Sequence, residues 1–471
     1  MNNKYKEFRE KYDTFIYHDY KIEIENQNIV VEFEFEIVGL STFNPKLIIP
    51  TDKIKDTLRK NGFDQSIDVT SNIVKNLVFN IGMVEVVSYL KLTCSKKLII
   101  ECGYLNDDQK IWFKKLYLNG LGEFFYINNI DVNEDEFIII KSNEDFKNLA
   151  LESPVELKGQ LIPVGGGKDS NVTMEVLRTL KNENTAFIVN ARGATIESTS
   201  AAGYEDDTII IERILDKNML ELNQKGFLNG HTPFSAMLAF LTTFIAYISR
   251  KKYIVLSNES SANEPNVVGT TINHQYSKSI EFENDFRYYS DTYLKTGTQY
   301  FSLLRPLTEL QITALFARYE KYHPVFKSCN VGSKKNIWCA NCSKCLFVYI
   351  MLSQFLDEDK MIKIFGENLL NKGSLRQTFI ELIGKGDNKP FDCVGTYEEI
   401  NYSLCSHILK CKNKDFMPIL LNEYFNNEYN NNIDSVKKVV EENREKLLKG
   451  YCNNNLPTKF EELLKNELKV L

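Results

Sequence analysis

Three features are scarce in this sequence of 471 residues, and each scarcity excludes a class of protein. Positive charge is not in excess, because 57 Lys and Arg residues face 63 Asp and Glu residues. The resulting net charge of -6 disfavours nucleic acid as a partner. The most apolar stretch, residues 234–248, is shorter than the about 20 residues that a membrane-spanning helix needs. We therefore expect a core helix there and no membrane partner.

Cysteine is the third scarce feature, with ten residues in the chain. This number is too small for a disulfide scaffold at this length, so clustered cysteines indicate metal or redox ligands. Residues 1–15 alternate charged and aromatic side chains without the apolar run of a secretory signal, which predicts a cytoplasmic protein. With 43% apolar and 25% charged residues, the composition is that of a globular protein of two or three domains.

The pattern along the chain predicts three regions, at residues 1–152, 153–350 and 351–471. In the first, residues 21–38 alternate apolar and charged side chains across an Asn-rich break, which predicts two half-buried strands joined by a turn. Residues 98–100 predict a short strand, and residues 107–118 predict a helix. We therefore expect a β-rich α+β domain at the N-terminus.

The second region alternates strands and helices, which is typical of a parallel α/β sheet. Short apolar runs at residues 161–164, 186–189 and 253–256 predict strands. The helix over residues 234–248 is expected to have Thr232 as its N-cap and Pro233 as its first residue. The third region is predicted to be an α-rich tail, in which the Asn-rich residues 422–432 form a surface loop.

The first chemical motif is the loop Gly165-Gly166-Gly167-Lys168-Asp169-Ser170, between a predicted strand and a predicted helix. Backbone N–H groups of such a loop can point at one anion, and the helix N-terminus adds positive charge, so phosphate is the expected ligand. Lys168 adds a cation, Ser170 a donor, and Asp169 a carboxylate that can position Mg²⁺. This is not the Walker spacing, because Asp169 separates Lys168 from Ser170.

The loop resembles the Ser-Gly-Gly-x-Asp-Ser loop of the PP-loop ATP pyrophosphatases, with Gly165 in place of the usual serine. The resemblance implies a HUP-like fold of the adenine nucleotide alpha hydrolase type and cleavage of ATP between its α and β phosphates. AMP is then transferred to a carboxylate or amide oxygen, which makes the carbonyl strongly electrophilic. The alternative is a tight strand-to-helix turn without a ligand.

The second motif has the spacing C-x9-C-x2-C-x2-C and consists of Cys329, Cys339, Cys342 and Cys345. Four thiolates can surround one ion tetrahedrally, so we expect a structural Zn²⁺ site that fixes the tail to the ATP domain. An iron–sulfur cluster or four unconnected thiols are the alternatives. Similar cysteine sets occur in the 7-cyano-7-deazaguanine synthases, which are also PP-loop enzymes and therefore a competing assignment.

A third set of segments, residues 229–235, 257–265 and 273–279, is dense in polar groups at predicted strand ends and helix starts. Together with NIGMVEVVSYLKLTC, KKLYLNGLGEFFY and KPFDCVGTYEE, they resemble the MurL family of ATP-dependent UDP-N-acetylmuramoyl-L-alanyl-L-glutamate epimerases of bacterial cell-wall synthesis. The resemblance implies inversion of a terminal L-glutamyl residue, in a UDP-muramoyl dipeptide or a related peptide. ATP is consumed to AMP and pyrophosphate.

The implied reaction needs groups that move protons. Adenylation cancels the charge of the carboxylate and makes the α-proton more acidic, so that a base can remove it and an acid can return it from the opposite face. The candidates are His231 and His274, whose imidazoles titrate near neutral pH, with Glu259 and Cys393 behind them. The structural alternatives are capping or packing for the histidines and a buried core thiol for the cysteine.

Candidates for binding the substrate are two amides and three cations: Asn258, Asn263, Lys278, Arg287 and Arg305. The cations suit the diphosphate or the glutamyl carboxylates, although a surface cation is as often only solvated. Glu259 and Glu264 are alternatives as Mg²⁺ ligands.

Three hypotheses follow, and they predict different products. A MurL-like epimerase yields AMP and a D-glutamyl residue. Another PP-loop enzyme, one that forms a nitrile or an amide, incorporates ammonia into its product. A nonenzymatic ATP-binding or tRNA-binding protein binds ATP without turnover or retains RNA, and the acidic net charge weighs against RNA.

Overall fold

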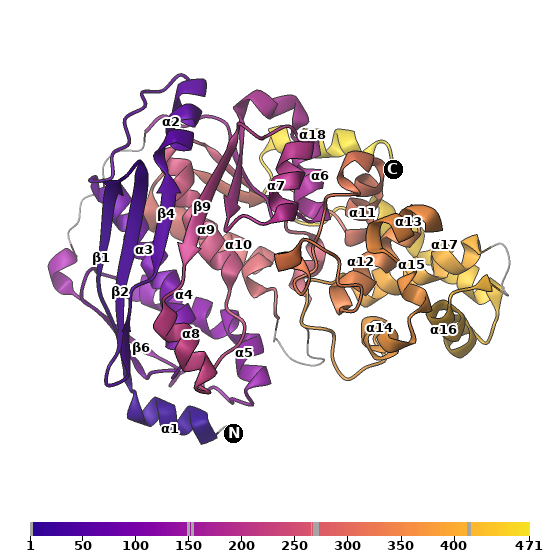
Figure 1. Cartoon of the computed structure of the whole chain (residues 1–471), viewed down its shortest axis with the longest axis horizontal. Coiled ribbons are helices and arrows are strands. Elements are labelled where there is room, and N and C mark those ends of the chain that lie inside the picture. Colours follow the sequence, from indigo (N-terminus) through magenta and orange to yellow (C-terminus); the bar gives the residue numbers. More distant parts are fainter. Residues whose placement is uncertain (1–2, 148–150, 152–154, 265, 267–272, 412–415) are drawn as a thin grey trace.

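The computed structural model describes residues 3–147, 151, 155–264, 266, 273–411 and 416–471, in which eleven strands form one sheet (Figure 1). The strands are β1 Thr14–Glu25, β2 Asn28–Ile37, β3 Ser41–Phe43, β4 Lys46–Pro50, β5 Lys97–Ile100, β6 Ile139–Ser142, β7 Gln160–Pro163, β8 Asn184–Val189, β9 Thr208–Ile214, β10 Tyr253–Leu256 and β11 Gln299–Ser302. Their order is β11-β10-β7-β8-β9-β4-β2-β1-β5-β6, with β3 paired to β2.

The α-helices precede, connect and follow these strands. They are α1 Asn3–Lys11, α2 Thr51–Lys60, α3 Asn72–Leu90, α4 Asp107–Gly120, α5 Gly122–Ile127, α6 Lys168–Val176, α7 Gly193–Ala201, α8 Lys217–Gln224, α9 Phe234–Ile248, α10 Ile280–Tyr289, α11 Glu309–Arg318, α12 Ser343–Ser353, α13 Glu358–Phe365, α14 Arg376–Leu382, α15 Tyr397–Lys410, α16 Ile419–Tyr429, α17 Ile433–Lys449 and α18 Thr458–Leu468. The molecule is therefore a mixed α/β protein with a helical C-terminal region.

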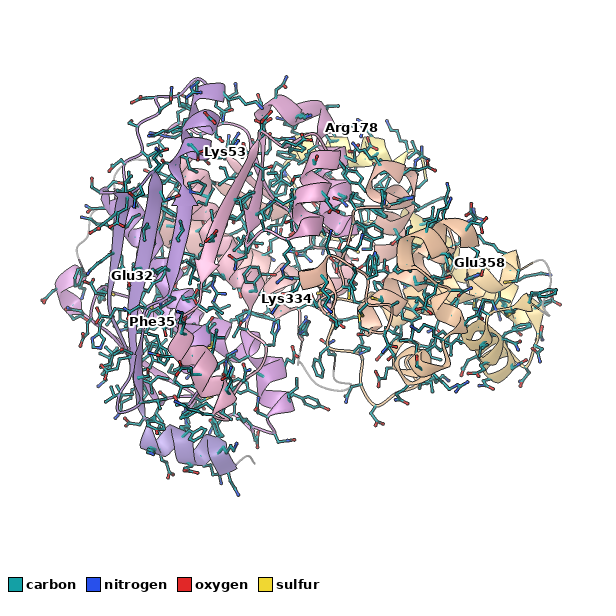
Figure 2. The ribbon with its side chains drawn as sticks, viewed as in Figure 1. Glu32, Phe35, Lys53, Arg178, Lys334 and Glu358 are labelled. Atoms are coloured by element: carbon teal, nitrogen blue, oxygen red, sulfur yellow. The ribbon has the colours of Figure 1, made fainter. Side chains whose placement is uncertain are left out.

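The N-terminal part of the sheet begins with the hairpin of β1 and β2. Asn26 and Gln27 have positive φ angles of 48° and 61°, which suit a two-residue turn that matches the twist of the strands. Every second side chain of β2 is buried, so Phe35 is fully covered whereas Glu32 is partly exposed (Figure 2). The two strands predicted from the alternation over residues 21–38 are confirmed.

The five strands β9, β8, β7, β10 and β11 are neighbours and all parallel. Numbered along the chain, they have the order 3-2-1-4-5, because the chain moves outward from β7 to β9 and returns on the other side of β7 at β10. Ligands of open α/β sheets bind at such a reversal, beyond the carboxyl ends of the strands. The predicted parallel α/β sheet is confirmed, and its reversal is the place to look for a site.

Both faces of the parallel strands are buried, which is the usual environment of a parallel sheet. Leu161 and Ile254 belong to an apolar core that also contains α3 and α9. Ile162 and Val255, the next residues of the same strands, belong to a second core with α6, α11 and α12. The first core includes side chains of β1 and β2 as well, so the N-terminal region and the parallel strands share an interior.

Helix α3 has no counterpart among the predicted elements. It is the one helix in the described residues that is long and apolar enough to cross a membrane by length and composition, yet 89% of that apolar window is buried inside the protein. It packs against α9 and β1. Because buried core helices pass the same test, its length and composition are weak grounds for a membrane span.

Helix α9 spans Phe234–Ile248, the apolar stretch predicted as a core helix, but the predicted cap Thr232 and first helical residue Pro233 are wrong. The N-cap is Pro233, and no side chain caps this end. The carbonyl of Thr232 accepts a hydrogen bond of 2.7 Å from the Phe234 N–H, so the chain makes a tight turn before the helix begins. The ψ angle of Pro233, 72°, lies outside the helical range, which moves the start of the helix one residue later than expected.

The C-terminal region is helical, as predicted, and is drawn from orange to yellow in Figure 1. The Asn-rich residues 422–432, predicted as a surface loop, instead lie mostly in α16, and that prediction is wrong. The helix forms because an apolar face is buried, made of Leu420, Leu421, Tyr424 and Phe425. It ends at Asn430, which adopts the left-handed conformation with φ 48°.

The last helix returns to the parallel strands. The ring of Phe460 on α18 lies 4.9 Å, between centroids, from the rings of Tyr253 on β10 and Phe301 on β11. The C-terminal tail therefore packs against the parallel strands.

The division into regions 1–152, 153–350 and 351–471 stays a prediction, and its first boundary lies outside the described residues.

Candidate active site

The glycine-rich loop lies at the carboxyl end of β7, directly before α6. Gly166 has a φ angle of +78°, and a Cβ atom there would be 2.7 Å from the carbonyl carbon of Ala194, so only glycine fits. The Gly166 carbonyl accepts a hydrogen bond of 2.9 Å from the Lys327 N–H, which anchors the loop to the segment before the cysteines. Gly165 is exposed with open space around its Cβ position, so a serine would fit there.

Lys168 is buried, with 1% of its side chain exposed. Its ammonium contacts the carboxylates of Asp169 and of Glu309, the first residue of α11. Burial alone would lower the pKa of Lys168, but these two carboxylates raise it. Burial raises the pKa of Glu309 to about 8 despite the neighbouring lysine. The loop lysine thus neutralises acidic groups at the base of the loop, and its contact with a phosphate stays a prediction.

Several polar groups beside the loop are buried and have no hydrogen-bond partner within the described residues. Asn171, in the first turns of α6, is fully buried, and both its side-chain oxygen and its nitrogen are without a partner. The buried hydroxyls of Ser257 and Ser328 also have no hydrogen-bond partner within the described residues. The Cβ atom of Ser328 lies 3.3 Å from the place that a Cβ atom on Gly167 would take. Because buried polar groups are normally hydrogen-bonded, these side chains fit a site that a polar ligand completes.

A second group of side chains, called here the thiol network, comprises Glu123, His231, His274, Lys278 and Cys393. His274 hydrogen-bonds the Glu123 carboxylate through Nδ1, and its side chain also acts on the Cys393 thiol. Lys278 donates to the Cys393 sulfur over 2.9 Å. The ring of His231 lies beside that of His274, with centroids 4.3 Å apart and planes tilted by 49°, and its Nδ1 is 3.6 Å from the Glu123 carboxylate. The fold thus brings together four residues predicted from distant segments, together with Glu123, which was not predicted.

The contacts within the thiol network set its charges. Burial would raise the pKa of Cys393, but the Lys278 ammonium and the His274 side chain lower it to about 6. Burial would lower the pKa of His274, but its hydrogen bonds to Cys393 and Glu123 raise it to about 9. Burial and the neighbouring His274 lower the pKa of His231 to about 4. At neutral pH the network therefore holds a thiolate, an imidazolium and a neutral imidazole.

Three members of the thiol network are placed so that they could together hold a metal ion. Glu123, His231 and His274 each place one potential ligand atom within 4.8 Å of the others. The positive charges of Lys278, on the Cys393 sulfur, and Lys344, on the Cys393 carbonyl, oppose a cation here. We therefore interpret these side chains as a proton-handling group.

The glycine-rich loop and the thiol network form one site because the same lysines serve both. Burial would raise the pKa of Asp169, but the charges of Lys168, Lys344 and Lys278 lower it. Lys278 and Lys344 also act on Cys393. Glu259 is 5% exposed, and its charge raises the pKa values of both Lys168 and Lys278. It therefore acts on the loop and on the thiol network. The glycine-rich loop and the Cys393 thiolate thus lie in one charged region at the reversal of the sheet, and binding of an anion by the loop stays a prediction.

The two predicted arginines make internal contacts. Arg305 is 1% exposed, pairs with Glu283, and donates to the backbone carbonyls of Glu259 and Lys278 over 2.6 and 2.5 Å. It therefore positions two residues of the site. Arg287 donates to the carbonyl of Tyr300 over 2.8 Å. Their predicted contact with a substrate stays a prediction.

The predicted amides and Glu264 also have partners in the fold. Asn258 donates to the Ser302 hydroxyl over 3.1 Å. The side-chain oxygen of Asn263 accepts from the Ile280 N–H over 2.9 Å, which ties the segment after β10 to the start of α10. Glu264 pairs with Lys389 over 2.7 Å. These contacts shape the rim of the site, and a role in binding substrate or Mg²⁺ stays a prediction.

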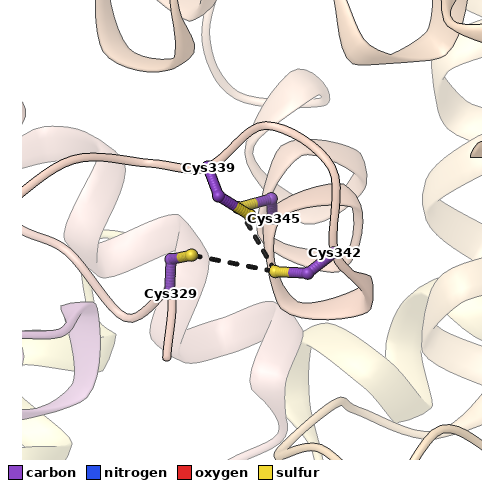
Figure 3. A group of neighbouring side chains, drawn as sticks. All are labelled: Cys329, Cys339, Cys342 and Cys345. Carbon is purple, nitrogen blue, oxygen red and sulfur yellow. Dashed lines mark hydrogen bonds between the residues drawn. The ribbon is translucent and has the colours of Figure 1, made fainter. Parts of the chain in front are cut away.

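The four clustered cysteines converge on one point (Figure 3). The sulfur atoms of Cys329 and Cys342 are 3.8 Å apart, those of Cys339 and Cys345 are 3.7 Å apart, and those of Cys342 and Cys345 are 3.5 Å apart. A tetrahedron of sulfurs with Zn–S bonds of about 2.3 Å has edges of about 3.8 Å. The separations are too long for disulfides, whose S–S bonds are about 2.0 Å. The donor set and its spacing therefore fit one tetrahedral ion.

The cysteine cluster holds the loop that carries Cys393. Asn330, which follows Cys329, donates to the Asp392 carboxylate over 3.3 Å, and Ser343 donates to its other oxygen. Lys344 donates to the carbonyl of Cys393. The residues adjoining the four cysteines thus position the reactive thiol.

A cleft of about 1640 Å³ lies next to the thiol network. Its lining includes Gly122, which precedes Glu123, and Asn273 and Tyr276, which flank His274. The lining also contains acidic and basic side chains, among them Lys115 and Glu281. This space is large enough for a substrate much bigger than a free amino acid.

Two protein-family models match this sequence. The model of the MurL N-terminal domain matches residues 6–303, and the model of the MurL C-terminal domain matches residues 325–435. The first match alone covers more than half of the chain. This chain belongs to the MurL family.

Three similar MurL proteins carry the name UDP-N-acetyl-alpha-D-muramoyl-L-alanyl-L-glutamate epimerase. The relative from Micromonospora sp. is 33% identical over 324 residues, which are 66% of this chain and 70% of the relative. Those from Xanthomonas oryzae pv. oryzae and Salinispora tropica are each 32% identical, over 66% of this chain and over 70% and 69% of their own lengths. No solved structure matches this chain.

The candidate site draws on both MurL domains. The glycine-rich loop, both histidines and Lys278 fall within the N-terminal match, whereas the four cysteines, Lys344 and Cys393 fall within the C-terminal match. The site is therefore complete only where the two parts pack together.

Sequence reasoning missed three charged residues of this MurL site: Glu123, Glu309 and Lys344. Glu123 lies in the segment KKLYLNGLGEFFY, which carried part of the family resemblance, and Lys344 lies between two of the clustered cysteines. Their places within these motifs are the sequence features that could have identified Glu123 and Lys344 as site residues. For Glu309 the sequence offers only its place before an apolar helix, so its contact with Lys168 depends on the packing of α11 against α6.

Proposed function

We propose that this protein is an ATP-dependent epimerase that inverts the α-carbon of the terminal L-glutamyl residue of UDP-N-acetylmuramoyl-L-alanyl-L-glutamate, with release of AMP and pyrophosphate. The observation that carries the proposal is the charged site in which Lys278, whose charge acts on Asp169 of the glycine-rich loop, also donates to the Cys393 sulfur. Membership of the MurL family and the names of three relatives support this substrate. The reaction belongs to peptidoglycan precursor synthesis.

A PP-loop fold of the HUP type is part of the proposal. The strand order 3-2-1-4-5 and the loop after the first of these strands support it. The loop would bind phosphates of ATP through backbone N–H groups and the N-terminus of α6, with Asn171 and Ser328 supplying hydrogen bonds. The Asp169 carboxylate, with 29% of its side chain exposed, would face Mg²⁺.

Adenylation prepares the substrate for inversion. A carboxylate oxygen of the glutamyl residue attacks the α-phosphate of ATP, and pyrophosphate leaves from the loop. The acyl-adenylate no longer carries the carboxylate charge, so its α-proton is more acidic. Proton transfer is assigned to the predicted residues His231, His274, Glu259 and Cys393, since they lie within one charged site. Water then hydrolyses the adduct.

The four cysteines would hold a structural Zn²⁺. Their sulfur separations of 3.5–3.8 Å support zinc in tetrahedral geometry, and an iron–sulfur cluster is the alternative. Bound metal would fix the segments around Asp392 and so the position of Cys393.

The decisive assay incubates the purified protein with Mg²⁺, ATP and UDP-N-acetylmuramoyl-L-alanyl-L-glutamate. AMP is quantified, and D- and L-glutamate are resolved by chiral chromatography after hydrolysis of the product. We expect D-glutamate and AMP to appear together. AMP without inversion would reject the substrate, and ammonia incorporation would favour a nitrile- or amide-forming enzyme.

The pH dependence of kcat/KM is expected to be bell-shaped. Activity should rise as Cys393 deprotonates, near pH 6, and fall as His274 loses its proton, near pH 9. The charged or titratable groups around this pair are Glu123, His231, Lys278 and Lys344. The check is kcat/KM measured across this range for the wild-type chain and for H274Q. A wild-type profile without an alkaline limb, or an unchanged alkaline limb in H274Q, would contradict the assignment.

A further inference from the structure

Cys393, His274 and Glu123 are connected as the members of a nucleophilic triad are. The His274 side chain acts on the Cys393 thiol and lowers its pKa, and the Nδ1 atom of that imidazole hydrogen-bonds the Glu123 carboxylate. A nucleophile, a base within reach of it, and a third group that orients the base are the recurring arrangement of covalent catalysis. The Lys278 ammonium, 2.9 Å from the sulfur, further favours the thiolate.

The same contacts disfavour Cys393 and His274 as the two opposed proton carriers of an inversion. Inversion requires removal of a proton from one face of the α-carbon and its return to the other face, so two carriers must flank the substrate. Cys393 and His274 interact with each other, and the ring of His231 lies tilted beside that of His274 with centroids 4.3 Å apart. These three side chains form one continuous group, so a substrate carbon does not fit between Cys393 and His274.

We propose that Cys393 is a covalent nucleophile that carries the glutamyl residue as a thioester while its α-carbon inverts. The inference rests on the proposed function, because adenylation supplies the activated acyl group. The sulfur attacks the carbonyl carbon of the acyl-adenylate, a C–S bond forms, and the acyl C–O bond to AMP breaks with both electrons leaving on AMP. After inversion, the oxygen of water bonds to the carbonyl carbon, the C–S bond breaks with both electrons leaving on the Cys393 thiolate, and the protons of the water pass to solvent.

The neighbours of Cys393 suit the steps that follow. A thioester keeps the carboxylate charge cancelled and so keeps the α-proton acidic after AMP has left. Lys278, at hydrogen-bond distance from the sulfur, lies close to where the carbonyl oxygen of that thioester would gain charge as the proton departs. His231 is not bonded to the sulfur in the described residues and has a neutral imidazole that can accept the proton.

The experiment traps the adduct on the full-length protein. Wild type, C393A, C393S and C452S are mixed with Mg²⁺, ATP and UDP-N-acetylmuramoyl-L-alanyl-L-glutamate, quenched in acid during turnover, and measured by intact mass and peptide mapping. We expect the wild type to gain the mass of the substrate minus one water, on Cys393, and to lose it in neutral hydroxylamine. C452S changes an exposed cysteine outside the site and should behave like the wild type.

The substituted chains separate the thioester from the proposed function. C393A should still release pyrophosphate and yield a glutamyl hydroxamate with hydroxylamine, because adenylation does not use the thiol, but it should lose D-glutamate formation by at least about 10³-fold. D-glutamate and AMP from the wild type with no adduct in either the wild type or C393S would overturn the thioester and leave the epimerase intact. Epimerase activity retained in C393A would overturn it equally. No AMP from the wild type would reject both.

Discussion

G166A is expected to lower kcat/KM for ATP by about 10²- to 10³-fold, the size of effect seen when preorganised donors are lost from an active site. Gly166 has a φ of +78°, and an alanine Cβ would lie 2.7 Å from the Ala194 carbonyl carbon. Both the backbone strain and the clash would force the loop away from α7 and misdirect its N–H groups. The measurement is pyrophosphate release as a function of ATP concentration.

The same loop supplies a matched control for G166A. G165S places a side chain where no atom lies within 4 Å and restores the serine of the related loops. We expect it to keep or increase ATP turnover, since an additional hydroxyl can reach a phosphate. If G166A keeps the activity of the wild type, or if both substitutions lower it equally, the loop does not bind ATP as proposed. Thermal unfolding of both variants distinguishes a local defect from loss of the fold.

C345S is expected to remove one equivalent of bound zinc and on the order of 4 kcal/mol of stability, because metal binding contributes directly to folding free energy. Cys345 is fully buried at the start of α12, and its sulfur lies 3.5 Å from that of Cys342. Loss of the ion leaves buried thiolates without a counter-charge, so they must take up protons or move apart. Metal content, thermal unfolding and epimerase activity are measured on the same preparations.

A second effect of C345S tests whether the cysteine cluster positions Cys393. The segment around the cysteines holds Asp392 through Asn330 and Ser343. Release of that segment should therefore slow alkylation of Cys393 at pH 7, because Lys344 no longer fixes its backbone beside Lys278. C452S should keep both the metal and the alkylation rate. A C345S protein with wild-type metal content would contradict the assigned ligands, and visible absorption of the wild type would indicate an iron–sulfur cluster instead.

The sequence predicts an element correctly where interactions between nearby residues determine its structure. The hairpin over residues 21–38 follows from strict alternation around a turn, and β10 and α9 follow from short apolar runs with clear ends. The wrong prediction of a surface loop at residues 422–432 has a physical cause. Residues 422–432 are polar in composition, yet burial of Tyr424 and Phe425 makes most of them helical. Composition alone does not report which face of a segment will be covered.

Tertiary packing brings together side chains that are far apart in the sequence. Glu123 is 151 residues from His274, and Lys168 is 141 residues from Glu309, so neither contact has a sequence signature. Lys168 contacts Asp169, its neighbour in the chain, and Glu309, which the packing of α11 against α6 brings to it, and its contact with a phosphate stays a prediction. Cys393, for which a core thiol was the alternative, lies beside a lysine and an imidazole instead.

The sequence by itself determined the motifs whose chemistry depends on near neighbours: the glycine-rich loop, the four cysteines and the family resemblance. The loop and the cysteine cluster need only residues close together in the sequence, because backbone N–H groups and metal ligands at short spacing converge through local geometry. The tertiary structure alone decided that loop, thiol and histidines share one site, and which of them are charged. Charge depends on burial and on partners from distant segments, and both exist only when the two MurL domains are packed together.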